Sequence, residues 1–273
     1  VLDRLTGSNI FEYKKKKAPL SNVPGEKTSY YQKIFSLPEP LSRQYFDEDH
    51  ITNLSKKSYN FVREQIKDAS YGFFVPNSID KKNIIYKGGA QWMGASIDNQ
   101  NSIMYLTSND VPFLIWLEKN KTKDYYDYSM KSGFLVDHLG YPGSKPPWGR
   151  LSAIDLNTGK KIWEVPFGEY EELTKKGIPI TGTYNFGGVT GTAGGLLFAT
   201  GAQDNKVKAF DSSNGNELWN YQLPYSGSTP PTIFEHLGEQ YVIVVSTGSY
   251  SLKQAFPKFS NFGNKIFAFK IPN

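Results

Sequence analysis

Two glycine-flanked aromatic segments are the parts of this 273-residue chain best suited to hold a ligand. Residues 88–94 are Gly-Gly-Ala-Gln-Trp-Met-Gly, with Trp92 between glycines, and residues 185–188 are Asn-Phe-Gly-Gly, with Phe186 before two glycines. Glycine lets the backbone approach a ligand closely because it has no Cβ, and an aromatic ring offers a face on which a flat group can stack. The same segments also suit ordinary turns between sheets, in which each aromatic packs into a core. The residues alone leave both interpretations open.

No side chains in the sequence show a pattern typical of catalysis or of metal binding. His50, His138 and His236 lie far apart, and their spacing matches neither a metal site nor a Ser-His-Asp triad. The chain has no cysteine, which excludes disulfides, cysteine-based zinc sites and a thiol nucleophile. It has neither a Walker loop nor a Gly-x-Gly-x-x-Gly fingerprint. The sequence therefore predicts a surface for a flat ligand, and no catalytic or metal-ligating residue within this chain.

An eleven-residue repeat predicts the elements that position these segments. Its copies begin at Val1, Ala153 and Ala209, and each has Asp third, Gly seventh and an aromatic residue eleventh. A shortened copy begins at Ile266. Glycine adopts the positive φ of a tight turn, and aspartate accepts hydrogen bonds from turn N–H groups, so the repeat predicts strand, turn and strand. The aspartates expected to act as turn acceptors are Asp3, Asp155 and Asp211.

The spacing of the copies predicts an all-β fold. Ala153 and Ala209 lie 56 residues apart, which is enough for one four-stranded blade of a β-propeller. A closed ring needs about four to eight blades, and this chain has room for fewer, so we expect an open, partial propeller of four-stranded blades. Because Val1 already lies inside a copy, we expect residues 1–273 to be the C-terminal segment of a longer propeller.

Residues 12–80 depart from the repeat and are expected to form a partly helical insertion, with the blade repeats occupying residues 81–273. Val62, Ile66 and Ala69 are spaced for the apolar face of a helix over residues 58–69, a helix that packs and takes no part in chemistry. The strands expected after it are residues 82–86, 102–107, 111–117, 195–200 and 206–210.

The net charge of +5 and the isoelectric point near 9.0 raise the question of nucleic acid binding. The one dense basic cluster, residues 14–17, is expected in a loop before Pro19 and lacks interleaved aromatics, so no nucleic acid partner is predicted. No apolar run is long enough to span a bilayer and no signal peptide is present. In a chain that begins inside a repeat, these absences say nothing about export.

The repeat Ala-x-Asp-x-x-Thr-Gly-x-x-x-Trp resembles the tryptophan-docking motif of quinoprotein dehydrogenases, eight-bladed propellers that bind pyrroloquinoline quinone (PQQ). Within that family, the chain resembles the membrane-bound glucose and quinate dehydrogenases over essentially its whole length, including the insertion. The matching segments are residues 1–4, 23–26, 28–29, 74–78, 146–149, 163–168, 187–188, 192–194, 240–245 and 266–272.

The resemblance implies the oxidation of a hydroxyl of a sugar or cyclic polyol. In that family a carboxylate base takes the proton, PQQ takes the hydride, Ca or Mg polarises the quinone, and electrons pass to ubiquinone at the periplasmic face of the inner membrane. The Asp base, a Lys that contacts PQQ and the metal ligands all precede the family segment that matches Val1. We therefore expect the N-terminal part of the same propeller to bind the metal, and this chain to be inactive alone.

The resemblance also implies which residues contact the cofactor: Gln91, Trp92, Phe186 and Gly187. Two segments depart from the family pattern. Residues 226–231 are Ser-Gly-Ser-Thr-Pro-Pro where the family has Gly-Gly-Gln-Ala-Thr-Pro, and Ser249 replaces a histidine. These departures leave the substrate open. An alternative is a non-catalytic propeller scaffold similar to the outer-membrane assembly lipoprotein, against which the insertion at residues 12–80 argues.

Overall fold

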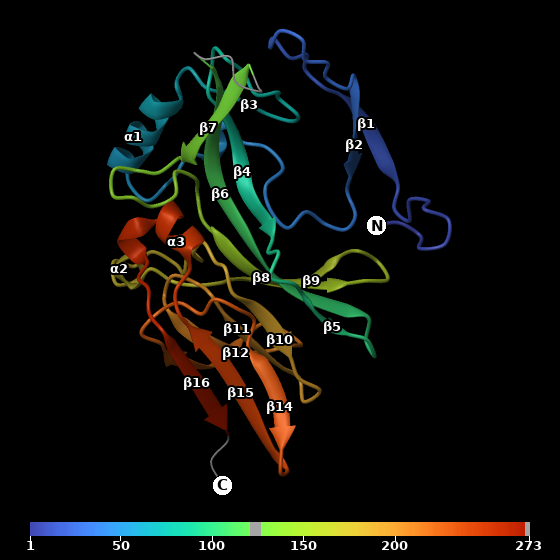
Figure 1. Cartoon of the computed structure of the whole chain (residues 1–273), viewed down its shortest axis with the longest axis vertical. Coiled ribbons are helices and arrows are strands. Elements are labelled where there is room, and N and C mark those ends of the chain that lie inside the picture. The colour runs from blue at the N-terminus through green and yellow to red at the C-terminus, as the bar shows by residue number, and fades with distance from the viewer. Residues whose placement is uncertain (121–126, 271–273) are drawn as a thin grey trace. The chain divides into compact units, whose positions relative to one another are not determined.

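The computed structural model describes residues 1–120 and 127–270, and most of its regular elements are strands (Figure 1). The chain divides into two compact units, which are described separately. The first consists of residues 1–87 and 111–145, and the second of residues 88–110 and 146–273. The predicted insertion at residues 12–80 lies within the first unit, and its boundaries remain a prediction.

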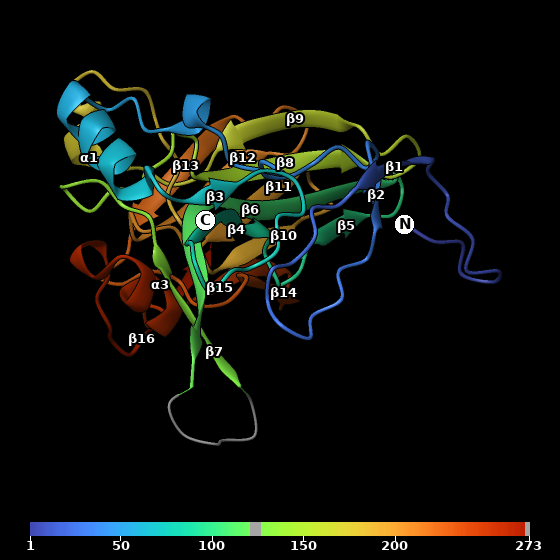
Figure 2. The same ribbon diagram turned by 90° about the horizontal axis from the view of Figure 1, so that it is seen from above.

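The first unit begins with an antiparallel hairpin of β1 (Tyr13–Lys17) and β2 (Tyr31–Phe35), visible in blue in Figures 1 and 2. The expectation that residues 14–17 form a loop is therefore wrong. Lysine is depleted in strands, but pairing with β2 along the full length of β1 overrides that weak preference. The remaining elements of the unit are η1 (Glu48–His50), α1 (Lys56–Ile66), β3 (Ser70–Tyr71), the first part of β4 (Asn83–Ala90), the last part of β6 (Ile103–Lys119) and β7 (Tyr128–Phe134).

Helix α1 confirms the predicted helix and its packing, but it ends at Ile66, so Ala69 lies beyond it. Ser55 caps its N-terminus by accepting a hydrogen bond from the Ser58 backbone N–H at 3.0 Å, which satisfies one of the amides that no helical carbonyl can reach. Val62 and Ile66 are buried, as the periodicity predicts. They pack in one apolar cluster with Phe46, Ile51, Ile84, Leu114 and Leu135.

The two strands expected at residues 102–107 and 111–117 form one long strand, β6 (Ile103–Lys119), so that expectation is wrong. The strand changes partners along its length. Its first part, to Asn109, pairs with β8 (Gly149–Asp155), and its last part, from Phe113, pairs with β7. Pro112 lies between the β8 and β7 ladders, and its carbonyl accepts a hydrogen bond from the Leu135 N–H at 3.1 Å.

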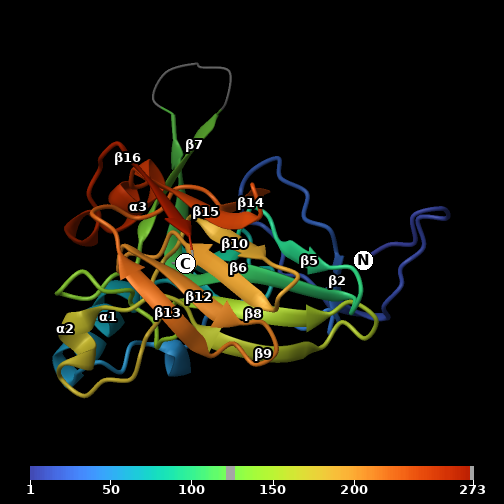
Figure 3. The ribbon, with the colours of Figure 1, turned by 90° about the horizontal axis from the view of Figure 1, so that it is seen from below.

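The second unit contains three antiparallel sheets (Figure 3). The first combines β5 (Ser96–Asp98), the first part of β6, β8 and β9 (Lys161–Pro166). The second has four strands in chain order, and the third has three. Their strands are β10 (Gly188–Gly191), β11 (Leu196–Thr200), β12 (Lys206–Asp211), β13 (Glu217–Gln222), β14 (Thr232–His236), β15 (Glu239–Ser246) and β16 (Lys265–Lys270).

These sheets confirm the predicted partial propeller. The second and third sheets are consecutive antiparallel meanders of the kind that builds a blade, and the first has antiparallel neighbours in the order β5, β6, β8 and β9, with β7 between β6 and β8 in the chain. Three blades in the described residues are too few to close a ring. Short helical segments connect some strands. They are α2 (Glu171–Thr174), α3 (Tyr250–Ala255) and η2 (Pro257–Phe259).

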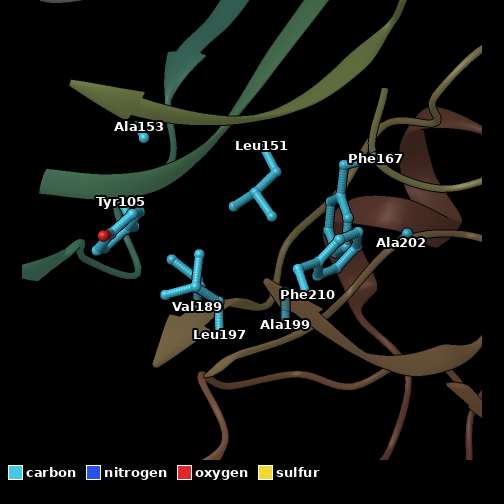
Figure 4. Close-up of a cluster of buried hydrophobic side chains, with 9 residues drawn as sticks. All are labelled: Tyr105, Leu151, Ala153, Phe167, Val189, Leu197, Ala199, Ala202 and Phe210. Carbon is cyan, nitrogen blue, oxygen red and sulfur yellow. The ribbon is translucent and has the colours of Figure 1, made fainter. Parts of the chain in front are cut away.

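The main core of the second unit joins the first and second sheets (Figure 4). Leu151 and Ala153 of β8 face Leu197 and Ala199 of β11, and all four are almost fully buried. The other members are Tyr105, Phe167, Val189, Ala202 and Phe210. The burial of these apolar side chains between the sheets provides the free energy that holds neighbouring blades together.

The repeat aspartates accept turn hydrogen bonds, as predicted. Asp155 accepts from the Asn157 N–H at 2.8 Å, and Asp211 accepts from the Ser213 N–H at 2.7 Å and the Ser213 hydroxyl at 2.6 Å. Asp3 accepts from the N–H groups of Leu5 and Thr6. Hydrogen bonds to the ionised form lower the pKa of all three carboxyls, first among them the Thr6 N–H at Asp3, the Asn157 N–H at Asp155 and the Ser213 hydroxyl at Asp211.

Candidate cofactor-contacting site

The first predicted segment is fixed at the end of β4 by close backbone packing. Gly88 has a φ of +134°, and a Cβ at this position would lie 2.5 Å from the Cβ of Asn109, so only glycine allows this approach. Three residues later, the Gln91 N–H donates to the Thr107 carbonyl at 2.9 Å. Gln91 is 9% exposed, so its side chain is held inside the unit and does not extend into solvent.

A buried network of amides joins the two predicted segments. Asn109 Oδ1 accepts from both the backbone N–H and the side-chain amide of Asn185, at 2.9 and 2.8 Å. The Asn185 carbonyl in turn accepts from Asn109 Nδ2 at 2.9 Å and from Gln91 Nε2 at 2.6 Å. Because Asn109 and Asn185 are at most 1% exposed, these bonds form without competition from water. The network places Trp92 and Phe186 next to one another.

Trp92 and Phe186 form an edge-to-face pair above this network. Their ring centroids are 6.3 Å apart with an interplanar angle of 89°. The Trp92 backbone N–H donates to Gln91 Oε1 at 3.0 Å, while the residue is 80% exposed. Phe186 also contacts Tyr184, whose pKa is raised to about 12 by burial, so its phenol stays neutral at physiological pH. The arrangement holds the backbone of Trp92 and leaves its indole ring open to a flat ligand.

Gly187 has a different position from the other three predicted site residues. A Cβ on Gly187 would lie 2.0 Å from the Thr200 carbonyl oxygen, and the residue is buried. This glycine lets two backbone segments touch, which supports Phe186 indirectly. Contact of Gln91, Trp92, Phe186 and Gly187 with a cofactor remains a prediction.

The turn that contains Pro230 lies close to the two aromatic segments. A Cβ on Gly188, where φ is +116°, would lie 2.8 Å from Pro230 Cγ and 3.5 Å from Met93 Cβ. The segment at residues 226–231, which departs from the family pattern, is therefore adjacent to both aromatic segments. Ser249, the other departure, caps α3 by accepting from the Leu252 N–H at 3.5 Å.

Asn109 and Asn185 are the residues of this site that the sequence analysis missed. Asn185 directly precedes Phe186, but nothing in the sequence pairs it with a residue 76 positions earlier. Next to Asn109, the buried Asp110 forms an ion pair with Arg150, with Nη2 and Oδ2 2.8 Å apart, and Arg150 Nε lies 3.3 Å from Glu164. A charge buried away from water is costly unless it has a partner of opposite charge. The ion pair with Arg150 therefore explains how the charged Asp110 can lie buried in β6.

The described residues also bear on metal binding and on membrane crossing. Across residues 1–120 and 127–270, no three or more His, Cys, Asp or Glu side chains are grouped so that they could hold a metal ion. His50, His138 and His236 lie in η1, in the loop after β7 and at the end of β14, respectively. No helix in the described part of the chain is both long enough and apolar enough to cross a membrane.

Comparison with known proteins identifies the family of this chain. Residues 1–242 match the β-propeller domain of glucose, ethanol and alcohol dehydrogenases that use PQQ. The chain belongs to this family.

Three relatives show how similar the chain is to characterised sequences. The glycerol dehydrogenase large subunit of Gluconobacter thailandicus is 30% identical over 92% of this chain and 39% of its own length. The quinate/shikimate dehydrogenase (quinone) of Acinetobacter baylyi is 26% identical over 91% of this chain and 35% of its own. Quinoprotein glucose dehydrogenase A of Acinetobacter calcoaceticus is 24% identical over 100% of this chain and 37% of its own. The chain thus spans less than two fifths of the length of these relatives.

The residues present could cover one face of the PQQ ring system. PQQ is a flat, conjugated ring system, and Trp92 offers an exposed ring held in place by Gln91 and flanked by Phe186. The amide network beneath holds the backbone that carries this ring. The family implies a divalent metal as well, but the described residues provide no group of ligands for one.

Proposed function

We propose that this chain is the C-terminal segment of a propeller that oxidises a hydroxyl of a sugar or cyclic polyol with PQQ and passes electrons to ubiquinone. The enzyme would act at the periplasmic face of the inner membrane. The observation that carries this proposal is the exposed Trp92 ring, which the buried pair of Asn109 and Asn185 places beside Phe186 in a member of the PQQ family.

In this proposal the chain contributes binding and orientation. When bound, PQQ accepts the hydride from the carbon that carries the hydroxyl. Trp92 would cover one face of the cofactor and exclude water from it, and Gln91 would keep the Trp92 backbone in place through the hydrogen bond between Oε1 and N–H. The carboxylate base and the ligands of Ca or Mg would come from the N-terminal part of the same propeller.

An apolar groove beside the third sheet supports the need for that additional part. The groove has a volume of about 430 Å³ and is lined mainly by apolar side chains, among them Phe198, Leu218, Trp219 and Phe269. The third sheet has three strands where the second has four, and among the described residues β16 pairs only with β15. A fourth strand from the N-terminal part would pair with the open edge of β16, which otherwise is a site for aggregation.

An assay of the isolated chain tests this proposal. The chain would be mixed with PQQ and Ca²⁺, given glucose, glycerol or quinate, and monitored for the reduction of a ubiquinone analogue. We expect no turnover, and we expect activity when a polypeptide containing the preceding part of the reading frame is supplied. Turnover by the chain alone would contradict the proposed division of residues. An absence of PQQ binding in the completed protein would favour the non-catalytic scaffold.

A further inference from the structure

The hairpin of β1 and β2 carries all of the net charge of this chain. Residues 13–35 contain six lysines, one glutamate and no arginine or aspartate, which gives +5, the net charge of the whole protein. The other 25 basic and 25 acidic residues cancel. A chain whose excess charge is confined to one hairpin has a local positive field there and none on average elsewhere.

The register of the hairpin places lysines and aromatic rings alternately on one face. Tyr13 pairs with Phe35, Lys15 with Lys33, and Lys17 with Tyr31, and directly paired residues share a face of the sheet. This face, the lysine–aromatic face, therefore consists of three lysines and three aromatic residues. Lys15 and Lys33 stand directly opposite one another, an arrangement that destabilises the hairpin unless an anion lies against it.

No carboxylate of the described chain neutralises these lysines. Within residues 1–120 and 127–270, none of Lys14, Lys15, Lys16, Lys17 and Lys33 forms an ion pair. Every residue of β1 is exposed. The single acid of the segment, Glu26, accepts a hydrogen bond from Ser21 in the loop between the strands.

We propose that the lysine–aromatic face binds the surface of a membrane that contains anionic phospholipids. Each lysine near such a surface adds to the attraction, so the three lysines of this face, Lys15, Lys17 and Lys33, together suffice for weak, reversible attachment. Tyrosine is enriched where membranes meet water, and Tyr31 is 55% exposed on this face. The long aliphatic stems of lysine can lie on the apolar boundary while the ammonium groups reach phosphate.

The geometry favours phospholipid over single-stranded nucleic acid. Proteins that bind single strands stack bases on open aromatic rings. Here Lys33 Nζ lies 4.4 Å from the centre of the Tyr13 ring, so an ammonium group lies over one of the three rings of this face. A base would have to displace that ammonium group to stack on Tyr13, and the hairpin has no arginine for bidentate phosphate contacts. The choice also rests partly on the proposed function, which brings the protein to a membrane.

Vesicle sedimentation tests the proposal on the chain as it exists. We expect the chain to sediment with vesicles of phosphatidylcholine and phosphatidylglycerol, to remain free with phosphatidylcholine alone, and to be released by salt. The triple variant Lys15→Gln, Lys17→Gln and Lys33→Gln, which neutralises the lysines of this face, should lower the affinity about 100-fold. A control with the same net charge changes three exposed lysines outside the hairpin: Lys57→Gln, Lys160→Gln and Lys176→Gln.

The outcomes separate this inference from the proposed enzyme activity, because vesicle binding needs neither PQQ nor turnover. Equal loss of binding in the hairpin variant and the control would show a general charge effect and overturn the assignment to the hairpin. Binding to phosphatidylcholine alone would overturn the role of charge. Hairpin-dependent binding of a single-stranded oligonucleotide without vesicle binding would assign the face to nucleic acid. Circular dichroism should show the same fold for both variants, since the altered lysines lie at the surface.

Discussion

The indole of Trp163 in β9 covers Gly215 in the turn between β12 and β13, and so joins two neighbouring sheets. A Cβ on Gly215 would lie 2.7 Å from Trp163 Cε3 and 2.9 Å from Cζ3. Trp163 Nε1 also donates to the Ser212 carbonyl at 2.9 Å, within the same turn. Trp163 is the eleventh residue of one copy of the repeat and Gly215 is the seventh residue of the next. The repeat therefore encodes the contact between consecutive blades as well as each turn.

Replacing Gly215 with alanine tests that contact. The new methyl group would collide with the indole ring, and the φ of +76° is strained for any residue with a Cβ, so we expect Gly215→Ala to destabilise the fold by about 2–4 kcal/mol. Gly7 is the same repeat position in another copy and has a φ of +70°, but a methyl group there would meet no atom within 4 Å, so Gly7→Ala should cost about 1 kcal/mol. Urea unfolding measures both, and equal losses would show that the contact with Trp163 is unimportant.

The two repeat tryptophans should differ in their effect on stability. Trp163 packs against the main core and donates a hydrogen bond, whereas Trp219 is 39% exposed beside the open groove and contacts Phe269 with ring centroids 5.4 Å apart. We expect Trp163→Ala to cost about 3–5 kcal/mol and Trp219→Ala about 1–3 kcal/mol. Urea unfolding should be followed by circular dichroism, because both substitutions remove a tryptophan and so change the fluorescence signal. If Trp219→Ala destabilised the fold as much as Trp163→Ala does, the third sheet would be packed against its neighbour as firmly as the second sheet is.

Removal of the Trp92 ring should weaken PQQ binding. Stacking on one aromatic ring contributes about 1 kcal/mol, so we expect Trp92→Ala to raise the dissociation constant about tenfold or less, and Trp92→Phe to restore most of the affinity. Isothermal titration calorimetry with PQQ measures this directly. Phe234→Ala, which removes another exposed ring at 45% exposure, is the control. Unchanged affinity in Trp92→Ala would remove Trp92 from the site.

The turn aspartates should make stability depend on acid pH. Hydrogen bonds in the folded state lower the pKa of Asp155 and Asp211 below the unfolded value of 3.8, so their contribution is present above that value and is lost as the pH falls through the folded pKa. We expect the urea midpoint to fall as the pH drops below about 4. The double variant Asp155→Asn and Asp211→Asn should be less stable at neutral pH and show a smaller acid loss. Asp68→Asn, outside the turns, should leave the acid loss unchanged.

The sequence determined the parts of this protein that depend on neighbours in the chain. Each repeat turn is formed by Asp, Thr or Ser, and Gly within a few residues, and the Asp155 carboxylate finds its N–H partner two positions later. Such contacts form whatever the rest of the chain does, so the turns, α1 and the four-stranded unit could be predicted. The family resemblance carried the same information over a longer range, because it depends on the order of these local segments.

Tertiary structure alone decided how distant residues meet. Asn109 and Asn185 pair across 76 positions, and β6 runs through Pro112 while it pairs first with β8 and then with β7. Residues 14–17 form a strand only because β2 lies beside them. None of these features has a local signal, since each depends on which strand the folded chain places alongside. Two polar side chains shielded from water must find one another, and packing selects which pair does so.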